Sequence, residues 1–404
     1  MANAPVAYDL THLVSRLMSR KPSGIDQIDL AYARHFLAPG RAPLASGVKY
    51  GLSAGRVLDN AAANSALAAA DRTWRVAKSA ASAGTPGSRL AAHVAHLRHR
   101  AARTRGATIP EGAVYLNVAQ HLLEWPFLLR WLDRRPDLRK VFFLHDLLPL
   151  DYPEYFRATN VRAFGKRIAT ALHHADAFIV STEAVRDRLV REIGRHGLAP
   201  RPILAAPFGS RLADVAEAPG EPSVADPYFL MVGTIEPRKN HLMILHVWRD
   251  IAERMGPKAP RLAIVGARGW HYGQVADLLD RGGPWRGLVH ETGAISDAAL
   301  KSLMRGARAL LAPSIDEGFG LPIVEALEAG TPVIAAGNAA AREVSRGHAK
   351  LLSPIDGAAW RSSVLDLLDA DGPASAEAKR LARGYVAPTW KDHFASVEDF
   401  IAGL

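Results

Sequence analysis

Short runs of apolar residues alternate with amphipathic stretches along the second half of the chain. The runs at 227–235 ("PYFLMVGTI"), 260–269 ("PRLAIVGARG") and 287–295 ("GLVHETGAI") predict buried strands. The stretch at 241–256 has helical spacing and ends at a glycine, which is typical of a helix terminus. Because strands that alternate with helices pair in parallel, we expect a doubly wound α/β domain in this half.

The first half shows the same alternation with more interruptions. The predicted strands are 113–119, 139–146, 175–182 and 202–208, and the predicted helices are 161–175 and 183–194. The Ala- and Arg-rich residues 50–110 are expected to form helical pieces around a mobile joint at "SAGTPGS". The stretch "AEAPGEPSVADP", rich in Pro and Glu and without periodicity, indicates a linker between the halves. We therefore expect one domain over 1–218, a second over 225–384, and a final amphipathic helix over 385–404.

Bulk composition narrows the class of protein. A chain of 404 residues suits two domains. The absence of cysteine excludes disulfides, zinc thiolate sites and thiol nucleophiles. No apolar run approaches the ~18 residues that span a bilayer, and the N-terminus lacks the basic start and apolar core of a signal peptide. The expected location is the cytoplasm.

Charge is unevenly distributed between the halves. Residues 1–220 hold 30 Lys and Arg against 18 Asp and Glu, a charge of +12, whereas residues 221–404 hold 20 and 22, a charge of −2. A basic half suggests an anionic partner such as nucleic acid, a membrane surface or a phosphorylated acceptor. A solvated surface that keeps the protein soluble explains the same excess, and the charge alone does not decide between the two.

Residues 313–336 ("PSIDEGFGLPIVEALEAGTPVIAA") combine carboxylates with glycines and a proline. Pro322 suits the first position of a helix, which we expect over 321–329 with a stop at Gly330. Glu317 then lies in the preceding loop and Glu325 in the first turn or just past it. Both carboxylates would face the positive end of the helix, and Glu328 would merely complement the helix dipole.

The glycines in this loop indicate a binding site for an anion. Gly318 and Gly320 remove side chains and expose N–H groups at a helix N-terminus, a place that can hold a phosphate. The loop follows the predicted strand "ALLAPS", so it lies at the carboxyl edge of the sheet, where open α/β folds bind ligands. Carboxylates beside a phosphate cradle suit a molecule that carries diols at both ends of a diphosphate. A nucleotide sugar is such a molecule.

The stretch "EGFGLPIVEALEAGTPV" resembles the donor-site motif of family-four retaining glycosyltransferases, in which two glutamates are separated by seven residues. The resemblance extends through "FLMVGTIEPRKNHLMILHVW", "LAIVGARGW", "VHETGAISDAALKSLMRGARALLAPS" and "AAREV", and in patches through "FFLHDLLPLDYPEYF", "FIVSTEAVRDRLV" and, weakly, "RKPSGIDQIDLAYARHF". It implies two Rossmann-like doubly wound domains that face each other across a cleft, the GT-B architecture. It also implies that the last helix crosses back to the first domain.

The resemblance assigns roles to individual residues. Glu317 would bind hydroxyls of the donor sugar, Glu325 the ribose diol, and Arg238 and Lys239 the departing diphosphate. Many relatives have an arginine where this chain has Thr234, so Arg238 is expected to supply the second charge. His145 would face the donor sugar, with Asp146 beside it to fix the histidine tautomer or orient the acceptor. The further residues expected at the donor or acceptor loops are Gly233, Gly318, Phe319, Gly320, Leu321 and Gly24.

The implied reaction moves a hexose from a nucleoside diphosphate sugar to a hydroxyl of a glycan or a polyprenyl-diphosphate-linked acceptor, with retention of anomeric configuration. GDP-mannose is the first choice of donor, because the motifs resemble those of bacterial mannosyltransferases of surface polysaccharide assembly, and a UDP-sugar is the second. No "DxD" cluster lies beside the motif, so neither a metal nor another cofactor is expected. The basic stretches "RHRAARTR" and "RWLDRRPDLRK" would contact anionic lipid at the inner face of the cytoplasmic membrane.

Three other readings remain open on the sequence. A nucleotide-sugar 2-epimerase shares the two-domain fold and would act without an acceptor. A nucleic-acid-binding protein would explain the basic half, although the chain shows no helix-turn-helix, zinc or RNA-recognition signature, and we expect no nucleic-acid partner. A sugar-binding homologue without activity would also keep the fold, but the intact site residues argue against such decay: Glu317, Glu325, Arg238, Lys239 and His145.

Overall fold

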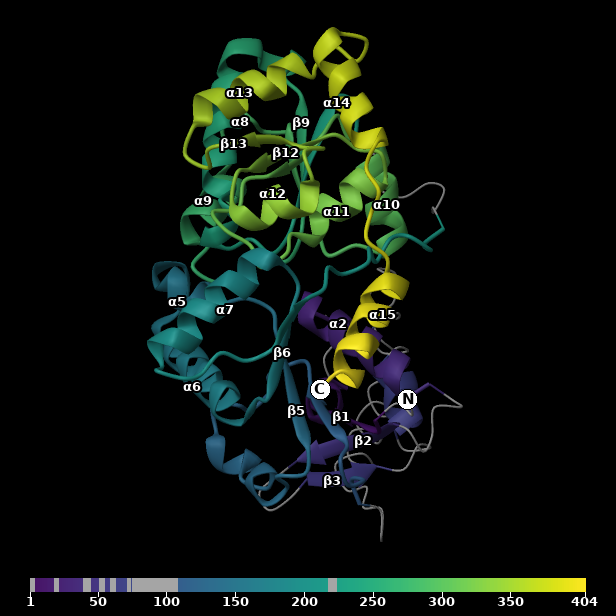
Figure 1. Ribbon diagram of the computed structural model, residues 1–404. Coiled ribbons are helices and arrows are strands. Elements are labelled where there is room, and N and C mark those ends of the chain that lie inside the picture. The colour runs from purple at the N-terminus through teal and green to yellow at the C-terminus, as the bar shows by residue number, and fades with distance from the viewer. Residues whose placement is uncertain are drawn as a thin grey trace.

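The computed structural model describes residues 4–17, 22–38, 45–50, 55–58, 63–70, 74, 108–216 and 224–404. These residues form two sheets with helices on both faces of each (Figure 1). The two parts are stacked, with the second sheet at the top of the view and the first at the bottom. The prediction of two doubly wound α/β units is confirmed.

The first sheet has the strand order β3-β2-β1-β4-β5-β6-β7, and all of its pairs are parallel except β2 with β3. Its strands are β1 (Val6–Asp9), β2 (Ala45–Tyr50), β3 (Gly55–Leu58), β4 (Val114–Asn117), β5 (Arg139–Leu144), β6 (Ala177–Val180) and β7 (Ile203–Ala205). Its main helices are α1 (Thr11–Arg16), α2 (Gly24–Phe36), α5 (Leu148–Asp151), α6 (Ala158–His174) and α7 (Glu183–Arg195), with 3-10 turns at Pro126–Leu129, Leu132–Arg134 and Pro153–Tyr155.

The second sheet is wholly parallel, in the order β10-β9-β8-β11-β12-β13. Its strands are β8 (Tyr228–Val232), β9 (Arg261–Val265), β10 (Val289–Gly293), β11 (Leu310–Ala312), β12 (Val333–Ala336) and β13 (Lys350–Leu352). Its helices are α8 (His241–Met255), α9 (Gly273–Arg281), α10 (Asp297–Gly306), α11 (Leu321–Glu328), α12 (Ala339–Ser345), α13 (Gly357–Asp366) and α14 (Pro373–Arg383), with 3-10 turns at Pro237–Lys239 and Gly256–Lys258.

The final helix, α15 (Trp390–Ala402), leaves the second unit and lies beside α2 of the first (Figure 1). Its residue His393 is 2 % exposed and shares a hydrogen bond of 2.7 Å with the hydroxyl of Tyr32 on α2. The ring of Phe394 stacks on that of His35, with 3.9 Å between centroids. The chain therefore crosses between its two halves twice among the described residues, once before β8 and once before α15.

The apolar core is continuous between the two units. One cluster of buried side chains covers one face of each sheet and passes through Phe208 and Phe319, whose rings lie 5.1 Å apart. Separate clusters fill the other face of each sheet. Because these two rings are buried against one another, the two sheets are packed together at the edges where their loops meet.

Two expectations about local structure are corrected. Residues 55–58, placed among helical pieces, form strand β3, because they pair in register with β2 from Gly47 to Tyr50. Residues 63–70 are helical as expected, and the joint at "SAGTPGS" lies outside the described residues. Pro322 occupies the second rather than the first position of α11, because Gly320 with φ of +93° forms the cap and Leu321 begins the helix.

Candidate active site

A loop between β11 and α11 lies at the carboxyl edge of the second sheet. It runs from Pro313 to Gly320 and carries Asp316, Glu317 and Gly318 toward the first unit. Gly320 turns the chain into α11 with a left-handed backbone that side chains other than glycine rarely adopt. We call residues 313–320 the motif loop.

Glu317 is held by two basic side chains of its own unit. Arg238 Nη1 donates to Glu317 Oε2 at 2.8 Å, and Lys239 Nζ donates to the other oxygen. Burial alone would raise the pKa of Glu317, but the charges of Arg238 and Lys239 lower it to about 2. The carboxylate is therefore ionised at neutral pH, and the prediction that these three residues share one site agrees with where the structure puts them.

Arg238 is the centre of this cluster. Its Nη1 also donates to the carbonyl of Asp316 at 2.7 Å, and its Nη2 donates to Glu236 Oε1 at 2.7 Å. Its Nε is buried and has no hydrogen-bond partner among the described residues. A buried N–H of a cation without an acceptor is costly, so this atom marks a place where an anionic oxygen would be stabilised.

The backbone around the cluster is shaped to receive the lysine. Gly233 follows β8 with φ of +146°, and a Cβ at that position would lie 3.3 Å from Lys239 Cε. Asn240 ends the 3-10 turn in a left-handed conformation, and its side chain donates to the carbonyls of Pro313 and Pro354. Arg238 and Lys239 therefore precede α8 and are not exposed residues of a helix start. Thr234, next to Gly233, is half-buried.

His145 and Asp146 follow β5 of the first sheet and meet the motif loop. A Cβ on Gly318 would lie 2.5 Å from the carbonyl oxygen of His145 and 2.9 Å from Asp146 Cβ. Glycine at 318 thus permits the two units to touch. The sequence predicted an exposed N–H at this glycine as part of a phosphate cradle, and the structure adds the close approach of the two units as a reason for glycine here.

His145 is half-buried and neutral at physiological pH. Burial, opposed by a hydrogen bond from Nε2 to the carbonyl of Val118 at 2.9 Å, lowers its pKa to about 4. Because Nε2 donates to a carbonyl, Nδ1 is the nitrogen left as an acceptor. Burial raises the pKa of Asp146, while the charge of Arg238 from the other unit opposes the shift. The Asp146 carboxylate accepts a hydrogen bond from the N–H of Leu148 at 3.1 Å.

Glu325 lies just past the first turn of α11, where the sequence predicted it. It is the fifth residue of that helix, it is fully buried, and both of its oxygens accept hydrogen bonds from Arg211, at 2.6 Å from Nε and 2.9 Å from Nη2. The structure therefore pairs this carboxylate with a cation from the segment after β7, a partner that the sequence did not predict.

Three further contacts join the motif loop and α12 to the first unit. Arg188 of α7 forms an ion pair with the buried Asp316, and Thr182 Oγ1 donates to the carbonyl of Gly318 at 2.9 Å. The carboxylate of Glu343 on α12 accepts hydrogen bonds from the first two backbone N–H groups of α7, at 2.8 and 3.1 Å. Sequence patterns did not identify Arg188, Arg211 or Glu343, because their partners lie more than a hundred residues away along the chain.

The remaining predicted site residues lie either at the joint between the two units or at the start of a helix. Phe319 is 6 % exposed and packs on Phe208, so its side chain contributes to the joint between the units rather than to a ligand surface. Leu321 is half-buried at the start of α11. Gly24 begins α2, and nothing lies within 4 Å of a Cβ placed on it. Three residues further along that helix, Gln27 accepts a hydrogen bond from Arg211 at 3.0 Å.

The space beside the cluster is small in this conformation. A cavity of about 20 Å³, lined by Lys239, Glu317 and Ile323 among others, has room for about one water molecule. A nucleotide needs far more room. The two units would therefore have to separate at the motif loop to admit a ligand of that size.

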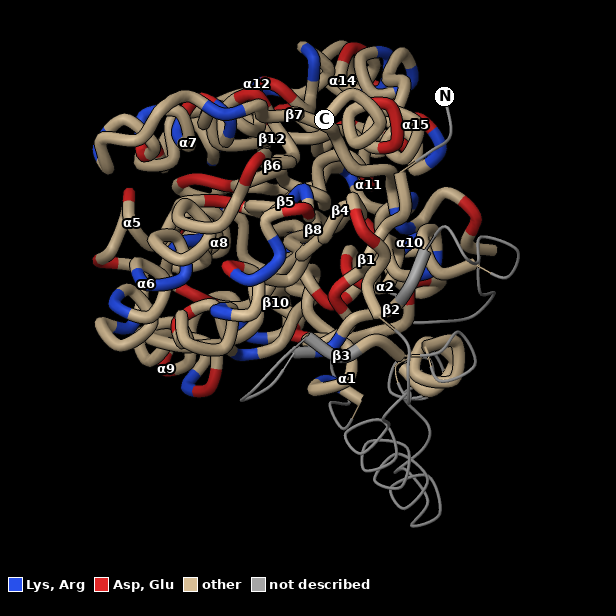
Figure 2. Tube along the Cα trace, turned by 60° about the horizontal axis from the view of Figure 1, so that its bottom comes forward, with Lys and Arg blue, Asp and Glu red and all other residues tan. Residues whose placement is uncertain are grey.

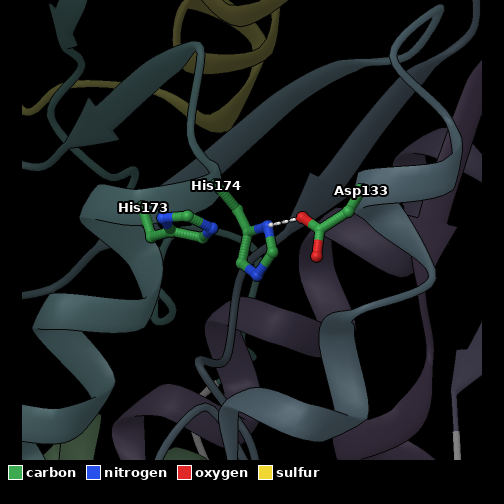
Figure 3. Close-up of side chains that lie close together, drawn as sticks. All are labelled: Asp133, His173 and His174. Atoms are coloured by element: carbon green, nitrogen blue, oxygen red, sulfur yellow. Dashed lines mark ion pairs between the residues drawn. The ribbon is translucent and has the colours of Figure 1, made fainter.

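A second group of titratable side chains lies away from the cleft. Asp133, His173 and His174 come from the crossover before β5 and the end of α6, and His174 Nδ1 lies 3.3 Å from Asp133 Oδ1 (Figure 3). Lys140 and Arg201 line the same hollow, and the charge of Lys140 helps to lower the pKa of His174, chiefly lowered by burial. These cations oppose a metal ion, so we assign no site to this trio.

The charged residues of the described part of the chain are mixed in sign. Figure 2 shows acidic and basic segments interspersed over both units. None of the helices in the described part is long and apolar enough to cross a bilayer. The basic stretch "RHRAARTR" lies outside the described residues.

Residues 226–370 match the family described as glycosyl transferases group 1. The serotype-specific mannosyltransferase WbdA of Escherichia coli is 32% identical over 222 residues, which cover 52% of this chain and 27% of that protein. The O-antigen chain mannosyltransferase B of Escherichia coli is 28% identical over 241 residues, covering 58% of this chain and 62% of that protein. The chain thus spans about a quarter of WbdA.

Solved structures share the fold over the whole chain. HepE of Anabaena in complex with UDP superposes with a TM-score of 0.61 at 16% identity, covering 99% of this chain and 100% of that one. Sucrose-phosphate synthase from Thermosynechococcus elongatus superposes with a TM-score of 0.58 at 15% identity, covering 99% and 94%. At these identities the likeness shows the fold, which is GT-B, and nothing about the ligand.

Proposed function

Residues 226–370 are a glycosyl transferases group 1 domain in a GT-B fold, and from that premise we propose that the chain is a retaining mannosyltransferase. It moves mannose from a nucleoside diphosphate sugar to a hydroxyl of a glycan or lipid-linked acceptor. GDP-mannose is the first choice of donor. The mannosyltransferase names of the relatives support the sugar. A UDP-sugar is the second choice.

The observation that carries the proposal is the cluster of Arg238, Lys239 and Glu317. It places two half-buried cations at the edge of a parallel sheet, and one of them has a buried N–H without an acceptor among the described residues. When the bond between the anomeric carbon and the diphosphate breaks, negative charge develops on the departing oxygens. Fixed cations in a buried site stabilise such charge strongly, because little reorganisation is needed.

The other site residues complete the reaction scheme. Glu317 orients Arg238 and Lys239. Once these two cations also pair with the diphosphate, the carboxylate can accept hydrogen bonds from sugar hydroxyls. Neutral His145 can accept a hydrogen bond from the sugar through Nδ1. The acceptor oxygen attacks the face that the diphosphate leaves, and its proton passes to a departing phosphate oxygen. This route needs no metal and no protein nucleophile.

Transfer is tested by incubating the protein with GDP-mannose, UDP-glucose or UDP-N-acetylglucosamine and a mannoside acceptor. The expected product contains a new α-mannosidic bond by NMR, and the Glu317→Gln variant is expected to form it much more slowly. Hydrolysis or epimerisation of the donor without any transfer, or equal product from the variant, would contradict the proposal.

A membrane-bound acceptor is the finer part of the proposal. In the turn after residue 124, Trp125 and Phe127 are 53% and 45% exposed, with ring centroids 6.2 Å apart, and Arg130 and Arg134 are exposed nearby. Exposed aromatic rings beside basic residues suit the interface of an anionic bilayer. Flotation with anionic vesicles should recover the protein, and a Trp125→Ser, Phe127→Ser variant should remain in solution. Equal recovery with neutral vesicles would contradict this part.

A further inference from the structure

Arg211 connects the two units at Glu325, the carboxylate that the family resemblance assigns to the ribose of the donor. It lies in the segment after β7, which leads out of the first sheet, and it reaches α11 of the second. Its Nε and Nη2 each donate to one oxygen of Glu325. This bidentate geometry is among the strongest for an arginine–carboxylate pair. Its side chain is 22% exposed, whereas that of Glu325 is not exposed at all.

This contact excludes a ribose from Glu325 in the present conformation. A vicinal diol would bind a carboxylate by donating one hydrogen bond to each oxygen, which is the pattern that Arg211 already supplies. Because Glu325 has no exposed surface, a second donor pair has no access while the arginine is in place. Arg211 must therefore move before Glu325 can bind a ribose.

A second carboxylate lies within reach of the arginine. Asp297, in the first turn of α10, has an oxygen 3.8 Å from Arg211 Nη1, and its side chain is 27% exposed. A small rotation of the guanidinium would exchange the buried partner for this more exposed one. The same nitrogen donates to Gln27 on α2, so the exchange also loosens the contact between the arginine and that helix.

We propose that Arg211, in the unliganded protein, occupies the hydrogen-bonding positions on Glu325 that the ribose of the donor would take. When a nucleotide binds, the arginine turns toward Asp297. The inference rests on the proposed function, because it takes Glu325 as the ribose ligand. It makes Arg211 a positioning residue that keeps the empty site closed. Nucleotide binding then costs the free energy of breaking one buried ion pair.

The test is isothermal titration of GDP, UDP and ADP into the intact protein and into Arg211→Gln. Because the variant no longer competes for Glu325, we expect it to bind the preferred nucleotide about tenfold more tightly than the wild type. The matched control is Arg308→Gln, which removes an ion pair with Asp226 away from the motif loop and should leave affinity unchanged. Equal or weaker binding by Arg211→Gln would overturn the proposal.

Two further variants keep the test decisive. If Arg211→Gln does not fold, Arg211→Lys replaces it, because lysine keeps the charge but cannot make the bidentate contact. We expect this variant to bind the nucleotide more tightly than the wild type, by a smaller factor. Unchanged affinity would count against the proposal. Asp297→Asn removes the second partner and should weaken binding several-fold, whereas unchanged affinity would contradict the exchange. Failure of the wild type to bind any of the three nucleotides would overturn the proposed function and this inference together; binding that Glu325→Gln leaves intact would overturn this inference alone.

Discussion

The two glutamates of the motif occupy different electrostatic settings although they are eight positions apart. Glu317 is paired with Arg238 and Lys239, which belong to the same unit, so its contacts survive when the two units separate. Glu325 is paired with Arg211 from the segment that leads out of the first sheet, so its contact depends on how the units sit. Glu317 therefore belongs to a preformed cation site, whereas the ion pair of Glu325 is present only when the two units are closed against one another.

The largest expected effect falls on the preformed site. Lys239→Ala removes one of the two cations that would face the departing diphosphate, and removal of one such group lowers kcat by roughly 10²–10³-fold. Initial rates of mannosyl transfer measure the loss. Lys350→Ala, which removes an exposed lysine of the same sheet, serves as the control. A loss of less than about threefold for Lys239→Ala would break the assignment of the preformed site.

The next effect is on stability and concerns the other glutamate. Glu325→Ala leaves Arg211 without its buried partner, so we expect the free energy of unfolding to fall by about 3 kcal/mol, at the low end for a broken buried pair because the arginine is partly exposed. Urea denaturation followed by circular dichroism measures it. Glu328→Ala, an exposed glutamate on the same helix, should change it by less than about 0.5 kcal/mol. A similar loss in the free energy of unfolding for Glu325→Ala and Glu328→Ala would contradict the buried ion pair of Glu325.

The contact between the units at Gly318 should affect catalysis more than folding. Gly318→Ala places a methyl group against the carbonyl of His145, so the motif loop cannot approach the first unit as closely. A displacement of about 1 Å at a reacting centre can lower kcat by about 10²-fold. Gly194→Ala, in α7 with open space around it, is the control. An active Gly318→Ala enzyme would indicate that closure at this point is not needed.

A smaller effect is expected where α12 meets α7. Glu343→Gln removes the charge that two backbone N–H groups of α7 share, and a charge at a helix N-terminus contributes about 0.3–1 kcal/mol. The melting temperature should fall slightly, and the fall should shrink as salt is added because the interaction is screened. A fall that does not depend on salt would mean that packing, and not charge, joins the two helices.

The last prediction is a pH dependence of the preformed site. Because the pKa of Glu317 is lowered from 4.5 to about 2, its ionised form stabilises the fold above pH 4.5, and this contribution is lost as the pH falls toward 2. The difference in melting temperature between the wild type and Glu317→Gln should therefore be constant from pH 5 to 8 and disappear in acid. A difference that grows below pH 4 would contradict the ion-pair account.

The regular alternation of apolar runs predicted most strands and helices of the second unit, because each element there is local and ends at a glycine, a proline or a cap. Ser296, for example, caps α10 through a hydrogen bond to the N–H of Ala299. Strands β1, β2 and β3 were not predicted. β1 pairs with β2 and β4, which are distant in sequence, and β3 lies in the Ala- and Arg-rich stretch where helical pieces were expected.

The site was predictable to the extent that its residues are close in sequence. Glu317 and the pair Arg238 and Lys239 stood out through their motifs. The partner of Glu325 did not, because nothing near Arg211 in the chain marks it as a ligand of a residue 114 positions away. Pairing between distant segments is decided by the packing of the two units, which periodicity does not describe.

The measurement that tests the central claim most directly is isothermal titration of GDP, UDP and ADP into the wild type and into Lys239→Ala. The account predicts that the wild type binds one of these nucleotides in preference to the others and that Lys239→Ala loses most of the affinity, because the lysine faces the diphosphate. Equal affinity in the two proteins, or no binding to the wild type, would contradict the claim that the cluster around Glu317 is a diphosphate site.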